Sequence, residues 1–133
     1  TVSFYCALHL IHAHIVQKTT KNYLSHSQVS HAINPFNPLS VSKVDEETYL
    51  SYTKLFQLSR RARYLLNENF DNTSAVDIQP ACVTYSKHFK KTVHHLNKIM
   101  DFMTTQHGTS FVKRSLKCID LNNQTFTYFT IIQ

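Results

Sequence analysis

The chain has 133 residues, of which 42% are hydrophobic and 17% charged, a composition typical of a globular domain rather than of a disordered chain. Fourteen Lys and Arg residues against eight Asp and Glu residues give a net charge of +6, before nine histidines are counted. This balance favours anionic partners such as nucleic acid, nucleotides or an acidic protein. The single glycine, Gly108, excludes phosphate-binding loops and dinucleotide folds, which need several glycines.

The first expected elements are a long helix and a short helical turn. Residues 2–18 predict a helix because apolar side chains recur at steps of three and four, namely Phe4, Leu8, Ile11 and Ile15. Residues 19–43 are a polar connection in which Pro35 and Pro38 forbid regular helix. Within this connection, residues 26–33 predict a short helical turn.

A second long helix is expected to begin between Ser42 and Asp45. These two residues have the spacing of a capping box, and the acids that follow suit the positive end of a helix dipole. The last turns of this helix carry a basic cluster that also complements the negative end of the dipole, formed by Arg60, Arg61 and Arg63.

A third long helix is expected in the second half of the chain, after a linker over residues 67–79. Pro80 fits the first turn of this helix, which should run to about His107 with Gly108 as its cap. One row of the helix is apolar. The other positions are strongly basic and include Lys87, Lys90 and Lys91.

The C-terminal tail, residues 109–133, is ambiguous. Residues 110–117 favour a short helix or loop, and the β-branched segment after them favours extended structure or a hairpin that turns at Asn122 and Asn123. The predicted fold class is therefore all-α. It is an antiparallel up-down bundle of three long helices plus a short fourth element over residues 1–108, with residues 109–133 packing on it as a tail.

Three segments resemble one known family. FYCALHLIHAHIVQK, SHSQVSHAI and YLSYTKLFQLSRRARY, followed by a basic amphipathic helix, are similar in order and character to HEPN (higher eukaryote and prokaryote nucleotide-binding) domains. The resemblance covers about residues 2–105. It implies an antiparallel helical bundle that is often dimeric, in a family of RNA-cleaving toxins, RNA-processing factors and partners of small nucleotidyltransferases.

The chain departs from the nuclease members of that family. Those members carry an Arg followed, after four to six intervening residues, by a His, and no His follows Arg60, Arg61, Arg63 or Arg114 at that spacing. The resemblance therefore implies a non-catalytic module that dimerises, or pairs with a nucleotidyltransferase-type protein, and binds RNA or nucleotide phosphate on basic helix faces. The alternatives are a divergent metal-independent ribonuclease and a purely structural interaction bundle.

The candidate binding residues are the basic ones, because arginine forks and clustered cations suit phosphate. They are Arg60, Arg61, Arg63, Lys87, Lys90 and Lys91. The competing interpretation is that the arginines only complement the helix dipole and that the lysines form a solvated surface. No residue is assigned to catalysis; if the chain performs acid–base chemistry, His9 and His26 are the first candidates, since histidine titrates near neutrality.

No cofactor, metal site or membrane association is expected. The histidines lack the spacing and the nearby Cys or acidic residues of a metal site, and no apolar run is long enough to span a bilayer. Three scattered cysteines, Cys6, Cys82 and Cys118, favour buried reduced thiols in a cytoplasmic protein over a disulfide framework.

Overall fold

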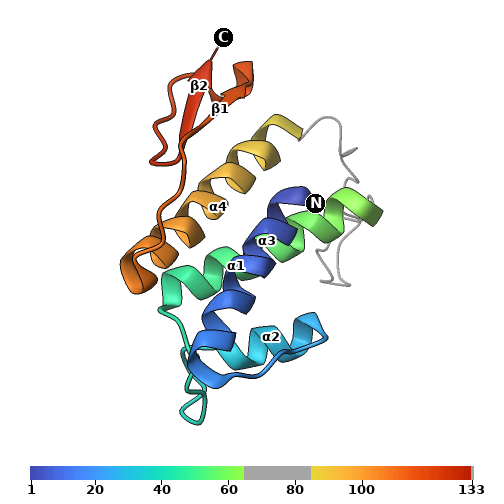
Figure 1. Cartoon of the computed structure of the whole chain (residues 1–133). Coiled ribbons are helices and arrows are strands. Elements are labelled where there is room, and N and C mark those ends of the chain that lie inside the picture. The colour runs from blue at the N-terminus through green and yellow to red at the C-terminus, as the bar shows by residue number, and fades with distance from the viewer. Residues whose placement is uncertain (65–84, 133) are drawn as a thin grey trace.

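The computed structural model describes residues 1–64 and 85–132, which are mostly helical (Figure 1). Within these ranges, four helices are followed by a small sheet with a 3-10 turn between its two strands. In chain order the elements are α1 (Val2–Thr19), α2 (His26–Ile33), α3 (Glu46–Tyr64), α4 (Tyr85–His107), β1 (Arg114–Lys117), η1 (Ile119–Leu121) and β2 (Phe129–Ile132). The predicted linker at 67–79, the expected helix start at Pro80, and Cys82 lie outside the described residues.

The main core lies where α1, α3 and α4 pack against one another. In the apolar stripe of α1, Phe4, Ile11 and Ile15 are fully buried there and Leu8 is partly buried. The stripe meets Tyr52 and Leu55 of α3 and Ile99 of α4. Each fully buried side chain of this size contributes about 1.5–3 kcal/mol. The short helix α2 packs on α1 and α3 through Val29 and Ile33, so the predicted helical turn at 26–33 is confirmed.

Helix α3 begins as expected, but its cap is Asp45 and not Ser42. The Asp45 carboxylate accepts hydrogen bonds from the Thr48 backbone N–H at 2.9 Å and from the Thr48 hydroxyl at 2.7 Å. The Ser42 hydroxyl is buried and donates to the Ala32 carbonyl at 2.9 Å. The predicted Ser42–Asp45 capping box is therefore wrong, because Ser42 is engaged with the end of α2.

The structure confirms only part of what the sequence predicts for the tail. Residues 114–117 form a strand rather than a helix, and β1 pairs with β2 in parallel, with Arg114 opposite Phe129. A hairpin at Asn122 and Asn123 would give antiparallel strands, so that prediction is wrong. Extended structure near the end of the chain is confirmed by β2.

The parallel pairing follows from how the connection between the strands is buried. η1 turns the chain directly after β1, and the connection then places Leu121 and Phe126 against Val93 of α4 in a second apolar cluster. Asn97 of α4 holds the same segment, because its side-chain carbonyl accepts from the Tyr128 backbone N–H at 3.3 Å. The expectation of a broadly all-α fold is thus confirmed for the described residues, with a small parallel sheet added by the tail.

Candidate anion-binding site

A basic cleft of about 490 Å³ lies between α3 and α4. Helical periodicity explains it, since residues three and four apart share one helix face. Three cations and two imidazoles therefore face one another across the two helices. The described residues that line this α3–α4 cleft include no acidic side chain; they are Lys54, Gln57, Leu58, Arg61, His88, Lys91 and His95.

His95 is a half-buried imidazole in the α3–α4 cleft. Its Nδ1 lies 3.2 Å from the Ser51 hydroxyl of α3. Burial, followed by the positive charges of His94, Lys54 and Lys91, lowers the pKa of His95 to about 4. The ring is therefore neutral near pH 7, where it can donate one hydrogen bond and accept another.

His88 is the second imidazole of the cleft. Its two ring nitrogens are buried, and neither has a hydrogen-bond partner among the described residues. Burial lowers the pKa of His88, followed by the positive charges of Arg61, Lys91 and Lys87. A buried polar atom without a partner costs about 1–3 kcal/mol. Because the ring torsion of histidine is soft, a small rotation can direct a ring nitrogen toward an acceptor in the cleft.

The three arginines of the predicted cluster point to different places. The Arg60 guanidinium lies over the Phe56 ring, 5.8 Å from its centroid, and the Arg63 Nη1 donates to the Tyr5 hydroxyl of α1 at 3.4 Å. Only Arg61 lines the α3–α4 cleft. Successive residues are about 100° apart around a helix, so the three side chains cannot share one ligand there.

The candidate lysines of α4 also differ in whether they line the cleft. Lys91 lines the cleft, and Lys87 is exposed but close enough to lower the pKa of His88. Lys90 is half-buried and does not line the cleft. Sequence reasoning missed Lys54 as a cleft residue, although the spacing of seven residues between Lys54 and Arg61 indicates that they share a face of α3.

The proposed catalytic candidates do not lie in the cleft. His9 is exposed on α1. His26 lies on α2 against the rings of Phe4 and Phe56, with centroid distances of 5.2 Å and 5.1 Å. Burial lowers the pKa of His12, and the charges of His9 and His26 lower it by smaller amounts. Within the described ranges, no three His, Cys, Asp or Glu side chains gather as metal ligands.

The buried histidine of α1 is His14. Its Nε2 lies 2.9 Å from the Ser42 backbone carbonyl, and its Nδ1 lies 2.8 Å from Nε2 of His107 at the end of α4. Because a carbonyl only accepts, His14 Nε2 carries the proton. Burial lowers the pKa of His14, so Nδ1 accepts from the His107 N–H. His14 therefore joins α1, α4 and the segment before α3, which is a structural role.

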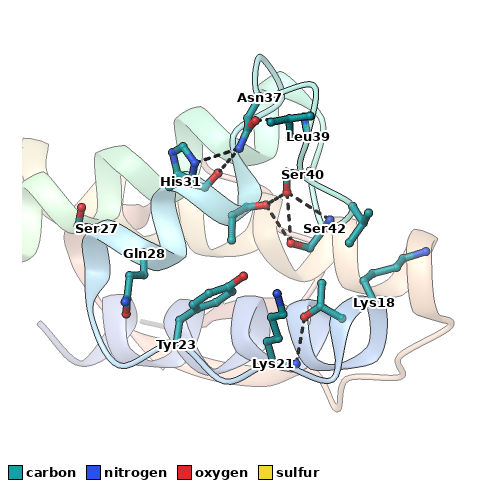
Figure 2. A pocket seen from close by; sticks show the side chains of 13 residues that line it. Lys18, Lys21, Tyr23, Ser27, Gln28, His31, Asn37, Leu39, Ser40 and Ser42 are labelled. Atoms are coloured by element: carbon teal, nitrogen blue, oxygen red, sulfur yellow. Dashed lines mark hydrogen bonds between the residues drawn. The ribbon is translucent and has the colours of Figure 1, made fainter.

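A second, larger hollow of about 720 Å³ lies among the end of α1, α2 and the segment before α3 (Figure 2). The Lys21 ammonium and the Tyr23 hydroxyl point into it from one side. On the other side, the Asn37 amide nitrogen lies 3.2 Å from Nε2 of His31. The cations of this hollow come from one short segment, and much of its far wall is already hydrogen-bonded. The α3–α4 cleft, with cations on both walls, is the stronger anion site.

Comparison with known proteins gives no assignment. No protein-family model, curated protein or solved structure matches this chain. The resemblance to HEPN domains therefore remains a prediction that rests on the quoted segments. In the part of the chain that the structure describes, no helix has both the length and the apolar character needed to cross a bilayer. Cys6 is exposed, so the expectation that its thiol is buried is wrong.

Proposed function

We propose that this chain is a non-catalytic, HEPN-like antiparallel helical bundle that binds RNA phosphate groups in the α3–α4 cleft and works as a dimer. One observation carries the binding proposal: Lys54, Arg61 and Lys91 line one cleft from its two walls. Like charges that converge repel one another. An RNA backbone relieves this repulsion and releases its own counterions on binding.

The geometry of the cleft favours binding over cleavage. His88 and His95 are neutral near pH 7, because burial and cations lower the pKa of both rings. A general acid or base works best with a pKa near the working pH, and the pKa of His95 lies well below it. This chain also lacks the Arg–His spacing of the nuclease members, which likewise favours binding over cleavage. The cleft is therefore proposed to hold phosphate without reacting with it.

The test is the salt dependence of binding to fluorescently labelled RNA, measured by anisotropy. The logarithm of the association constant should fall linearly with the logarithm of salt, by about 0.7 per phosphate neutralised on a single strand. Lys91→Gln and Lys54→Gln should each weaken binding and reduce that slope by about 0.7. Lys98→Gln is the matched control, because Lys98 lies on the same helix but pairs with Glu47 at 2.9 Å.

Two outcomes would contradict the binding proposal. The first is an absence of RNA binding at low salt, and the second is an equal loss in the Lys98 control. Metal-independent cleavage of the RNA, resistant to chelator and lost in His95→Ala, would instead support the alternative ribonuclease.

The proposed dimer rests on the outward face of α1. This face consists of exposed residues at helical spacing, namely Val2, Cys6, His9, Ala13 and Val16. Helix α1 carries no Lys, Arg, Asp or Glu before Lys18. An exposed, uncharged helix face with several apolar side chains is typical of a contact surface. Two copies of a chain with a net charge of +6 repel each other, and this face lets them approach without opposing like charges.

Analytical ultracentrifugation tests the dimer. The wild-type chain should sediment as a dimer, and Ala13→Glu should shift it to monomer by placing two like charges in the shared face. Val112→Glu changes an exposed apolar residue elsewhere and should leave the dimer intact. A wild-type chain that stays monomeric at high concentration would rule out self-pairing on this face.

A further inference from the structure

An aromatic pair lies in the first turns of α4, the helix that forms one wall of the cleft. Tyr85 and Phe89 are one helical turn apart, their rings are nearly parallel at 11°, and their centroids are 5.9 Å apart. Phe89 packs on the second apolar cluster, against Val93 and Leu121. Tyr85 is 59% exposed. One ring is thus anchored in the core, and it holds the other ring in a fixed orientation toward solvent.

The surroundings of Tyr85 are basic. The first turn of α4 carries no acidic side chain, and Lys87, His88 and Lys91 follow within two turns. Since residues three and four apart are neighbours on a helix surface, the Tyr85 ring adjoins His88, which lines the cleft. Another strongly exposed aromatic, Phe36 at 71%, lies in the segment before α3, away from the cleft.

An exposed aromatic beside a cationic cleft matches how proteins bind single-stranded nucleic acid. Cations track the phosphate backbone, and an unpaired base stacks on the aromatic face. Bases inside a duplex are already stacked and paired, so their faces are not accessible to a side chain. Of the two nucleic-acid forms, only a single strand can therefore use both Tyr85 and the cleft.

We propose that the chain selects single-stranded RNA, with one unpaired base stacked on Tyr85 and the adjoining phosphates in the α3–α4 cleft. This inference rests on the proposed RNA-binding function and adds the form of RNA that is bound. The stack on Phe89 keeps the Tyr85 ring in place before RNA arrives, so less side-chain freedom is lost on binding.

The experiment compares three probes by anisotropy and competition: a labelled single-stranded RNA, its duplex, and inorganic polyphosphate, which has charge but no base. Tyr85→Ala should weaken binding of the single strand by about 5- to 100-fold, with little change for polyphosphate. Tyr85→Phe keeps the ring and should stay within about twofold of wild type. Phe36→Ala removes an exposed aromatic elsewhere and should change nothing. Circular dichroism confirms that each variant is folded.

The outcomes separate this inference from the proposed function. If polyphosphate binds but Tyr85→Ala leaves the affinity for the single strand unchanged, the stacking inference is wrong and phosphate binding stands. Equal weakening of polyphosphate and RNA by Tyr85→Ala also overturns the inference, because the effect is then not on a base. If neither RNA nor polyphosphate binds at low salt, the proposed function and this inference both fail.

Discussion

Replacement of His14 by alanine should strongly destabilise the chain. The ring is buried, hydrogen-bonded to the Ser42 carbonyl and His107, and in edge contact with Phe102 at a centroid distance of 5.1 Å. His14→Ala leaves the buried Ser42 carbonyl without its partner, which costs about 1–3 kcal/mol. Loss of the aromatic contact removes about 0.5–1.5 kcal/mol more. The expected decrease in the free energy of unfolding is about 3 kcal/mol.

Urea unfolding followed by far-ultraviolet circular dichroism measures this decrease. With an unfolding slope of about 1–3 kcal/mol per molar urea, the midpoint should fall by about 1–3 M. His94→Ala is the matched control, since it changes the same residue type at an exposed position of α4, away from the proposed dimer face, and should cost no more than about 0.5 kcal/mol. A His14→Ala chain within about 1 kcal/mol of the His94→Ala chain would refute the assigned role.

His14→Ala should also change how the stability of the chain depends on pH. The folded chain lowers the pKa of His14 below its ordinary value of 6.5, so the unfolded chain binds more protons as pH falls. The stabilising contribution of neutral His14 is present above pH 6.5 and is lost as pH falls below it. His14→Ala should therefore lose less stability than the wild type between neutral and mildly acid pH.

Three further changes have defined outcomes. Tyr52→Phe should leave the free energy of unfolding unchanged or raise it by up to about 1 kcal/mol in thermal unfolding, because the buried Tyr52 hydroxyl has no partner among the described residues. A clear decrease would show that the hydroxyl is hydrogen-bonded. Gly108→Ala should cost about 1 kcal/mol in urea unfolding, because Gly108 has a φ of +63° with open space around it. RNA affinity should rise as pH falls, because bound phosphate raises the pKa of His88 and His95; a flat anisotropy profile would contradict this.

Local patterns predicted the helices well, since the core of this chain is built from helical stripes. The sequence alone predicts the stripe of α1 and the segment that forms α2. The sequence does not predict the form of the tail, because Leu116 alone does not distinguish a short helix from a strand. Its form depends on the distant contacts of Leu121 and Phe126 with α4, which no local pattern contains.

The site was predicted only in part, because side-chain direction depends on which helix face is buried. The spacing of the three arginines indicates that Arg61 points away from Arg60 and Arg63, but the face that meets α4 is selected by tertiary packing. That packing places Arg61 beside Lys91. Among the histidines of α1, sequence reasoning favoured His9. His14 lies three residues after Ile11 and so continues the buried stripe, a signal that was present in the sequence.

The two apolar clusters give the chain two regions that can open separately. The main core joins α1, α2, α3 and α4, whereas the tail is held to α4 by Leu121, Phe126 and the bonds of Asn97. Segments with few links to the rest of a fold exchange their amide hydrogens through local opening, without global unfolding. The amides of β1 and β2 should therefore exchange faster than those of α1. A change in the tail would then alter one face of α4 while the opposite face keeps its core contacts.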